Sequence, residues 1–316
     1  MDLRIAYLIL CHNDAVHIGR LARRLVSGMS GNAVFIHVDK KANIQEELIL
    51  SLKGVPNVCV IKERYQIYWG GFSAISATYA LLRAAVNNGG FDRYVLLQGA
   101  DYPIKSNQYI ADFYNKNNDV EYIRAVNCAT SEKQYFYAKA RYSLIFNHRN
   151  LLTKIRNKLV RILDLKLKPK QWAVDGKLWN VYWGCAQFAV THKCVELFLK
   201  YETHEALIKH FSDIFPADEA FFPTIVYNSD LVLNTTYGHP ESDQNIHNLV
   251  DLINLTYFEY PVLVTIFTQD DYQKIVDLPH LYVRKVCTTE SSELLDMIDR
   301  HSKAETWPCV SRSSPT

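Results

Sequence analysis

Short, continuous apolar runs separated by segments of helical periodicity make up the first hundred residues. The runs are Ile5–Cys11, Ala33–Asp39, Val58–Ile61 and Tyr94–Leu97. Runs of this length, bounded by polar residues, are typical of strands buried on both faces of a parallel sheet. Residues 14–27 and 73–86 repeat apolar side chains at helical spacing, and Ser73 is a candidate N-cap of the second helix. Strand–helix alternation of this kind predicts a doubly wound parallel α/β sheet.

The predicted sheet also indicates where a ligand would bind. Doubly wound sheets bind ligands beyond the carboxyl ends of their strands. Cys11-His12, Asp39 and Gly99–Asp101 fall at those ends. We therefore expect the functional site to be built around these residues.

The pattern beyond residue 120 is mixed. The apolar run Gly184–Val190 predicts one more strand, residues 192–201 a helix, and residues 218–227 a helix that Pro223 limits or bends. Neither a repeat nor a linker interrupts the chain. We expect a single domain over residues 1–300, followed by a flexible C-terminal tail, 301–316.

Composition narrows the class of protein. A hydrophobic content of 48%, with 22% charged residues and a net charge of +2, excludes wholesale disorder and a generally nucleic-acid-binding surface. Aromatic residues reach 12%, with twenty tyrosines, which suits surfaces that stack on sugars or bases. The seven cysteines include no Cys-x-x-Cys pair, which argues against a zinc site or a disulfide scaffold and favours reduced thiols. No apolar run is long enough to span a bilayer.

Several common catalytic motifs are missing from the sequence. It contains no Gly-x-Gly-x-x-Gly, no P-loop, no Gly-x-Ser-x-Gly and no His-Glu-x-x-His. An Asp-x-Asp pair, which would chelate a divalent ion against a nucleotide diphosphate, is also missing. The segment closest to such a pair is Asp119-Val120-Glu121. Because the pair itself is missing, a metal site is disfavoured. A metal-dependent transferase that uses Asp119 and Glu121 is the rival hypothesis.

An ordered set of short motifs resembles one enzyme family. The set is Ala6-Tyr7 with His12, Ile36-His37-Val38-Asp39-Lys40-Lys41, Trp69-Gly70-Gly71-Phe72-Ser73, Gln98-Gly99-Ala100-Asp101-Tyr102-Pro103-Ile104, Gly184-Cys185-Ala186-Gln187-Phe188, Pro216-Ala217-Asp218-Glu219 and Tyr257-Phe258-Glu259. It resembles the core-2/I-branching enzymes, glycosyltransferase family 14, which includes peptide O-xylosyltransferases. The resemblance implies a GT-A-like fold with a Rossmann-like central sheet and helices on both faces. It also implies inverting transfer from a UDP-sugar without a metal ion, which agrees with the missing Asp-x-Asp.

The resemblance makes Glu219 the catalytic base. Inverting transfer needs a carboxylate to take the proton from the acceptor hydroxyl as that hydroxyl attacks the anomeric carbon. Asp218 would be its structural partner. From the residues alone, both acids equally fit the first turn of a helix, where they complement the helix dipole.

Donor-binding residues follow from the same resemblance. It implies that Asp39 contacts the uridine, that Trp69 and Leu10 lie near it, and that Gly99 and Asp101 border the donor sugar. Each has a structural alternative: Asp39 as a loop-initiating residue, Leu10 and Trp69 as core, and Asp101 as a turn residue.

A basic segment near the C-terminus resembles the part of the family that binds phosphate. Lys285 matches a phosphate-contacting lysine, and fixed cations can replace magnesium in stabilising a departing diphosphate. The family's second cation, an arginine, aligns near Val262, so we expect Arg284 to substitute for it. The alternative is an ordinary exposed pair of cations.

The resemblance extends less fully to the acceptor side. Glu121 and Tyr257 match residues that touch the acceptor sugar, and Lys133 lies in the adjacent segment. A tryptophan expected two residues before Tyr257 is Leu255 here. Loss of that stacking platform indicates a different acceptor from the mucin core.

One feature is independent of the family. Residues 149–170 hold eight basic residues against one acid, Asp164. Leu151, Leu152, Ile155, Leu159, Ile162 and Leu163 share one helical face, with Lys154, Lys158 and Arg161 beside it. This pattern predicts a basic amphipathic helix that lies on an anionic membrane surface or binds an anionic acceptor. It also fits a surface helix whose apolar side packs on the core.

Together these features predict an enzyme that moves N-acetylglucosamine from UDP-GlcNAc to a sugar hydroxyl of a carbohydrate or glycoconjugate acceptor, forming a β-linkage. UDP-xylose is the alternative donor, and a non-catalytic sugar- or nucleotide-binding module on the same fold is the contrasting class. We expect no cofactor, no metal and no nucleic-acid partner. We also expect a cytoplasmic location, peripheral at the inner membrane, in polysaccharide biosynthesis.

Overall fold

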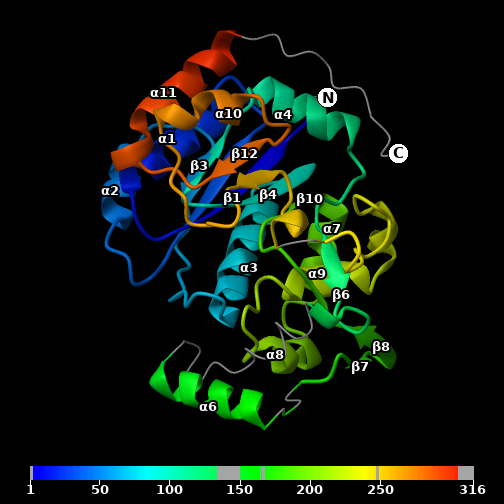
Figure 1. Cartoon of the computed structure of the whole chain (residues 1–316). Helices are drawn as coiled ribbons and strands as arrows, with labels where there is room; N and C mark the ends of the chain where they lie inside the picture. The colour runs from blue at the N-terminus through cyan, green and yellow to red at the C-terminus, as the bar shows by residue number, and fades with distance from the viewer. Residues whose placement is uncertain (1–2, 134–149, 164, 166–167, 247–248, 305–316) are drawn as a thin grey trace.

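The chain folds around a five-stranded sheet at the centre of the molecule. A computed structural model describes residues 3–133, 150–163, 165, 168–246 and 249–304 (Figure 1). The central sheet has the order β10-β4-β1-β2-β3, in which β10 alone runs antiparallel to its neighbour. Its strands are β1 (Ile5–Cys11), β2 (Ala33–Val38), β3 (Val58–Val60), β4 (Arg93–Gln98) and β10 (Ala189–Thr191). The predicted α/β fold is confirmed, with an antiparallel edge strand that the strand–helix pattern did not predict.

Both faces of this sheet are buried, which explains why its strands read as continuous apolar runs. Successive side chains of a strand point to opposite faces. Ala6 and Leu8 of β1 join one hydrophobic core, and Ile5, Tyr7 and Ile9 join the other. The sheet therefore separates two cores, as expected for a doubly wound fold.

Helices cover both faces of the central sheet (Figure 1). The first core is closed by α3, α7 and α9, and the second by α1, α4 and α11. The helices are α1 (Ala15–Val26), α2 (Gln45–Ser51), α3 (Phe72–Asn87), α4 (Asn107–Lys116), α6 (Leu151–Ile162), α7 (His192–Lys200), α8 (Glu205–Phe211), α9 (Phe221–Tyr227), α10 (Tyr272–Val276) and α11 (Thr288–Ala304), with 3-10 turns at η2 (Asp230–Asn234), η3 (Leu249–Leu252) and η4 (Gln269–Asp271). Among the described helices, none has the length and apolarity needed to cross a membrane. Since α11 continues to Ala304, the first residues of the predicted tail are helical.

Three smaller sheets lie beside the central one. Their strands are β5 (Asp101–Pro103), β6 (Ala125–Asn127), β7 (Gln171–Val174), β8 (Lys177–Asn180), β9 (Tyr182–Gly184), β11 (Thr256–Phe258) and β12 (Tyr282–Arg284), paired as β11-β12-β5, β6-β9 and β7-β8. The predicted single strand Gly184–Val190 is wrong. Gly184 ends β9 and Ala189 begins β10, so the apolar run passes from one sheet to another.

Two helix starts also differ from the prediction. Gly71 precedes α3, and the Ser73 hydroxyl accepts a hydrogen bond from the Tyr68 amide instead of capping the helix. The last predicted helix begins only at Phe221, so Asp218 and Glu219 lie in the loop before α9. Pro223 lies within its first turn, where the missing amide hydrogen costs nothing.

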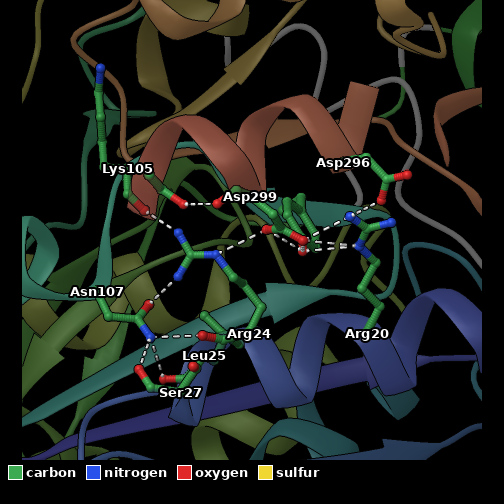
Figure 2. A network of polar contacts seen from close by, with 10 residues as sticks. Arg20, Arg24, Leu25, Ser27, Lys105, Asn107, Asp296 and Asp299 are labelled. Atoms are coloured by element: carbon green, nitrogen blue, oxygen red, sulfur yellow. Dashed lines mark hydrogen bonds and ion pairs between the residues drawn. The ribbon is translucent and has the colours of Figure 1, made fainter. Parts of the chain in front are cut away.

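An ion-pair network joins α1 to α11 and to the start of α4 (Figure 2). Asp299 Oδ2 lies 2.7 Å from Arg20 Nη2, and Asp299 Oδ1 lies 3.1 Å from Arg24 Nε. The Arg24 guanidinium also donates to Asn107 Oδ1 at 2.9 Å, and Asn107 Nδ2 donates to the Ser27 carbonyl at 2.9 Å. The Tyr102 hydroxyl of β5 donates to Asp299 Oδ1 at 2.9 Å, so this network fixes the helices on one face of the sheet and also holds β5.

Candidate functional site

A buried ion pair joins two of the predicted donor-binding residues. Strand β5 pairs antiparallel with β12, which sets Asp101 opposite Arg284. Arg284 Nη1 lies 2.8 Å from Asp101 Oδ1, and the Gln98 amide donates to Asp101 Oδ2 at 2.8 Å. Burial raises the pKa of the fully buried Asp101 carboxyl, and the charge of Arg284 opposes that rise. Asp101 therefore orients Arg284 and has no exposed surface of its own to offer a sugar.

Lys285 follows Arg284 and supplies a second cation. Its pKa is lowered, first by burial and then by the positive charge of Arg284, while Asp101 acts in the opposite direction. Within the described residues, its ammonium makes no hydrogen bond or ion pair. An incoming anion would relieve the repulsion between Arg284 and Lys285, so this pair suits a phosphate.

Main-chain hydrogen bonds hold the loop that carries Glu219. The Ala217 amide donates to the Gly70 carbonyl at 2.9 Å, and the Gly184 amide donates to the Glu219 carbonyl at 2.8 Å. A Cβ at residue 184 would lie 2.0 Å from the Arg124 carbonyl oxygen, so only glycine fits there. The sequence motifs around Gly70, Gly184 and Glu219 therefore meet in space.

Electrostatics connect this loop to Asp101. Burial raises the pKa of the Cys185 thiol to about 12, and the negative charges of Glu219, Asp218 and Asp101 add to the effect. Asp218 Oδ1 is buried without a hydrogen-bond partner, and burial raises the pKa of its carboxyl to about 6. The charges of Glu219, Asp218 and Asp101 thus all act on the Cys185 thiol, and Arg284 pairs with Asp101.

Asp39 and Trp69 belong to two loops that contact each other. Asp39 Oδ1 accepts from the Lys41 amide at 2.9 Å and from the Ile67 amide at 3.3 Å. The indole of Trp69 is 68% exposed and meets the edge of the Phe215 ring at 4.9 Å between centroids. Asp39 therefore shapes the loop that presents Trp69, and Trp69 is an exposed aromatic surface, not a core residue.

Leu10 and Gly99 lie side by side at the carboxyl ends of β1 and β4. The Gly99 amide donates to the Leu10 carbonyl at 2.9 Å. A Cβ at residue 99 would come within 2.9 Å of Cys11 and of Ile18, which explains the glycine by close approach of α1. Leu10 is partly buried and packs against the first core.

The aromatic residue beside Arg284 is Phe258, which belongs to the Tyr257-Phe258-Glu259 motif but to which no role was assigned from the sequence. Strands β11 and β12 are parallel, with Phe258 opposite Arg284, and the guanidinium lies 5.9 Å from the ring centroid. Tyr257 points to the other face, where its ring packs 5.4 Å from His280. The alternation of a strand could have shown that these neighbours face opposite ways, but the register with β12 could not be read from the sequence.

Of the other predicted acceptor residues, Glu121 does not join this cluster. Glu121 is 1% exposed, and its carboxylate accepts from the amide and hydroxyl of Thr191. These contacts assign Glu121 a structural role at the start of α7, which fits neither an acceptor contact nor a metal site with Asp119. Lys133 is exposed at the end of a described segment. The described residues contain no group of three metal-ligating side chains.

The arrangement can perform one kind of chemistry well. It places a carboxylate loop, a pair of cations and an exposed indole around the carboxyl ends of a parallel sheet. Carboxylates accept protons, and fixed cations stabilise an anionic leaving group. Such a site suits displacement of a phosphate-bearing group by a hydroxyl.

Comparison with known proteins adds a family and its relatives. The model of the family described as Core-2/I-Branching enzyme matches residues 5–245. Xylosyltransferase 2 of Pan troglodytes is 24% identical over 320 residues, which cover 95% of this chain and 34% of that protein. Xylosyltransferase 1 of Rattus norvegicus is 25% identical over 236 residues, which cover 72% of this chain and 26% of that protein. The chain thus spans about a third of the length of xylosyltransferase 2 and about a quarter of that of xylosyltransferase 1.

Among solved structures, a glucosyl-3-phosphoglycerate synthase from Mycobacterium tuberculosis, in complex with Mn2+, UDP and glucosyl-3-phosphoglycerate, matches with a TM-score of 0.30 and 12% identity. The match covers 64% of this chain and 66% of that one. A likeness of that size supports no conclusion about function.

Proposed function

Since the chain belongs to the Core-2/I-branching enzyme family, we propose that it is an inverting, metal-independent glycosyltransferase that uses a UDP-sugar. Its acceptor would be a sugar hydroxyl, and the product a β-linkage. The observation that carries the proposal is the buried Asp101–Arg284 pair, with Lys285 next to it in the chain, together with the Glu219 loop that is hydrogen-bonded to Gly184.

Glu219 is the proposed general base. Its carboxylate takes the proton from the acceptor hydroxyl while the hydroxyl oxygen bonds to the anomeric carbon. The bond from that carbon to the UDP oxygen breaks on the opposite face, so the configuration inverts. The hydrogen bond from the Gly184 amide to the Glu219 carbonyl fixes the loop that carries the carboxylate. The entropy of ordering this loop is therefore lost on folding and not during the reaction.

Arg284 and Lys285 are the proposed stabilisers of the departing UDP. The leaving oxygen gains negative charge in the transition state, and two fixed cations beside it lower the energy of that state. Asp101 positions Arg284 and does not contact the donor in this proposal. Because these cations can do the work of a divalent ion, we expect activity to survive EDTA.

Two donors are candidates. UDP-GlcNAc follows from the motif resemblance, and UDP-xylose is favoured by the names of the relatives, which are xylosyltransferases. Leu10, Asp39 and Trp69 are the proposed uridine contacts. We keep Tyr257 and Lys133 as proposed acceptor contacts, with the acceptor a carbohydrate or glycoconjugate, and we propose a cytoplasmic location.

Calorimetric titration of UDP, UDP-GlcNAc and UDP-xylose into the chain, with EDTA present, tests the donor site. We expect one sugar nucleotide to bind more tightly than the other, and Lys285→Gln to weaken UDP binding at least about tenfold because a charge-assisted contact is lost. Failure of all three to bind would refute the metal-free donor site.

Glu219→Gln tests the base itself. Turnover should fall about 10²- to 10⁴-fold, the usual contribution of a general base, while UDP affinity stays unchanged. Glu205→Gln, on the exposed start of α8, is the matched control and should keep full turnover. Equal turnover of Glu219→Gln and wild type would refute Glu219 as the base. No turnover in the wild type, with UDP still bound, would favour the non-catalytic binding module.

A further inference from the structure

Helix α6 (Leu151–Ile162) carries an apolar face that packs against nothing in the described structure. Five large apolar residues are between 49% and 71% exposed: Leu151, Leu152, Ile155, Leu159 and Ile162. Leu163 and Leu165 continue the exposed row beyond the helix, at 62% and 45%. Figure 1 shows α6 at the foot of the molecule, far from the central sheet. The interpretation that the apolar side of this helix packs on the core is therefore wrong.

This apolar face is turned away from the protein. At 3.6 residues per turn, the five residues fall within an arc of about 100°. The side of the helix that contacts the body is marked by Thr153 and Val160, which are 2% and 6% exposed. The centre of the apolar arc lies roughly 140° round the helix from these two residues. The result is a convex apolar ridge, not a groove.

Basic side chains border the ridge on both sides. Lys154 and Lys158 lie next to one edge of the arc and Arg156 next to the other, and all three are exposed. No acidic residue occurs within α6. Arg149 and Lys166 lie outside the described residues, as does Asp164. The exposed surface of the helix therefore combines apolar area with positive charge alone.

We propose that α6 is a membrane-surface anchor whose ridge inserts into the headgroup region of an anionic lipid bilayer. Helices with a strong apolar face and a cationic polar face lie in the membrane plane, with the apolar side buried among acyl chains and the cations beside anionic headgroups. With twelve residues, α6 is too short to span a bilayer, which takes about 20. It would therefore lie along the surface.

Charge favours a bilayer over a second copy of the chain as the occupant of this face. Two α6 ridges packed against each other would bring Lys154, Lys158 and Arg156 of both copies along one seam, where like charges repel. An anionic surface pairs with the same cations, and a flat bilayer matches a convex ridge. Six residues beyond the end of α6, the chain is tied to the body where Lys168 Nζ lies 2.6 Å from Asp213 Oδ1.

Co-flotation of the full chain with vesicles tests the anchor. Vesicles of phosphatidylcholine with about a third phosphatidylserine are compared with pure phosphatidylcholine, at low and high salt. We expect binding to the anionic vesicles only, and release at high salt because surface charge is screened. Lys154→Gln, Arg156→Gln and Lys158→Gln together should weaken binding about 100-fold, since each basic residue near the surface contributes roughly a factor of five.

The apolar triple variant Leu152→Gln, Ile155→Gln and Leu159→Gln separates insertion from charge alone. Its affinity for anionic vesicles should fall at least about tenfold, because the apolar side chains no longer insert. Its melting temperature should equal that of the wild type, because these side chains are exposed in the folded protein. Matched controls replace exposed residues elsewhere, Leu50, Leu233 and Val264 to Gln, and Lys53, Lys62 and Lys177 to Gln, and should bind as the wild type does.

Full vesicle binding by the apolar variant would overturn the proposal, since electrostatic attraction alone would then explain the binding without insertion of the ridge. Failure of the wild type to float with anionic vesicles would overturn it as well. So would a lipid-free dimer, seen by light scattering, that the apolar variant abolishes. None of these outcomes depends on sugar transfer, so the anchor and the enzyme can fail separately.

Discussion

Replacing Arg284 by methionine should destabilise the protein in a way that depends strongly on pH. The substitution keeps most of the side-chain volume and removes the charge that faces Asp101 at 2.8 Å. Asp101 is completely buried, so the loss leaves a carboxylate with one amide donor and without its ion-pair partner. Breaking a buried ion pair from one side typically costs about 3–5 kcal/mol. We expect about 3–4 kcal/mol at pH 8, since Arg284 is slightly exposed.

The cost should shrink as the pH falls. Burial already raises the pKa of Asp101, and loss of Arg284 raises it further. Above about pH 4 the unfolded chain has released this proton while the folded variant still holds it. Stability is therefore lost as the pH rises through that window, by up to about 1.4 kcal/mol per pH unit. A larger fraction of Asp101 is protonated in the variant at pH 5 than at pH 8, and the neutral acid needs no counter-charge, so we expect a smaller cost of about 1–2 kcal/mol.

Urea unfolding at pH 5 and pH 8 measures both values against the wild type. The double variant Arg284→Met with Asp101→Leu is the control, because replacing both partners with apolar residues removes the orphaned charge. It should recover most of the stability at pH 8 and none of the sugar transfer. A cost that does not change with pH would refute the buried pair, and recovery of activity in the double variant would refute the proposed role of Arg284.

Three further predictions concern the surroundings of the site. Gly184→Ala should cost about 3 kcal/mol in urea unfolding and lower turnover, because its Cβ would collide with the Arg124 carbonyl oxygen; wild-type behaviour would contradict the close approach. Asp299→Ala should cost about 2–3 kcal/mol of stability through the lost ion pairs of Figure 2, with unchanged turnover per folded molecule. The Cys185 thiol, with its pKa raised to about 12, should stay largely unmodified by iodoacetamide at pH 8 while the exposed Cys59 reacts; peptide mapping by mass spectrometry would reveal the opposite order.

The elements of the central sheet could be predicted because their causes are local. Ile5–Cys11 is apolar at every position since both faces of β1 are buried, and β1 has the predicted bounds. Helix α1 follows from apolar spacing, with Asp14 as its cap. Apolarity alone could not divide Gly184–Val190 into two strands, because a run that leaves one sheet and enters another has the same composition as a continuous strand.

Long-range register decides what the sequence could not reveal about the site. The Asp101–Arg284 pair joins residues 183 positions apart and exists only because β5 and β12 align as they do. The same register puts Phe258, not Tyr257, beside the guanidinium. Glu121 matched an acceptor position by resemblance, yet its side chain is buried and hydrogen-bonded to Thr191. For α6, the periodicity predicted the helix correctly but contained no information on whether its apolar side meets the core or solvent.

Donor hydrolysis followed by proton NMR tests the central claim without knowledge of the acceptor. With water in place of the acceptor, the enzyme should release UDP from UDP-GlcNAc or UDP-xylose, whose sugars are α-linked. We predict that the first sugar to appear, before it equilibrates in solution, is the β anomer, and that Glu219→Gln abolishes its release. An α anomer as the first product, or equal release by the Glu219→Gln variant, would contradict inverting transfer with Glu219 as the base.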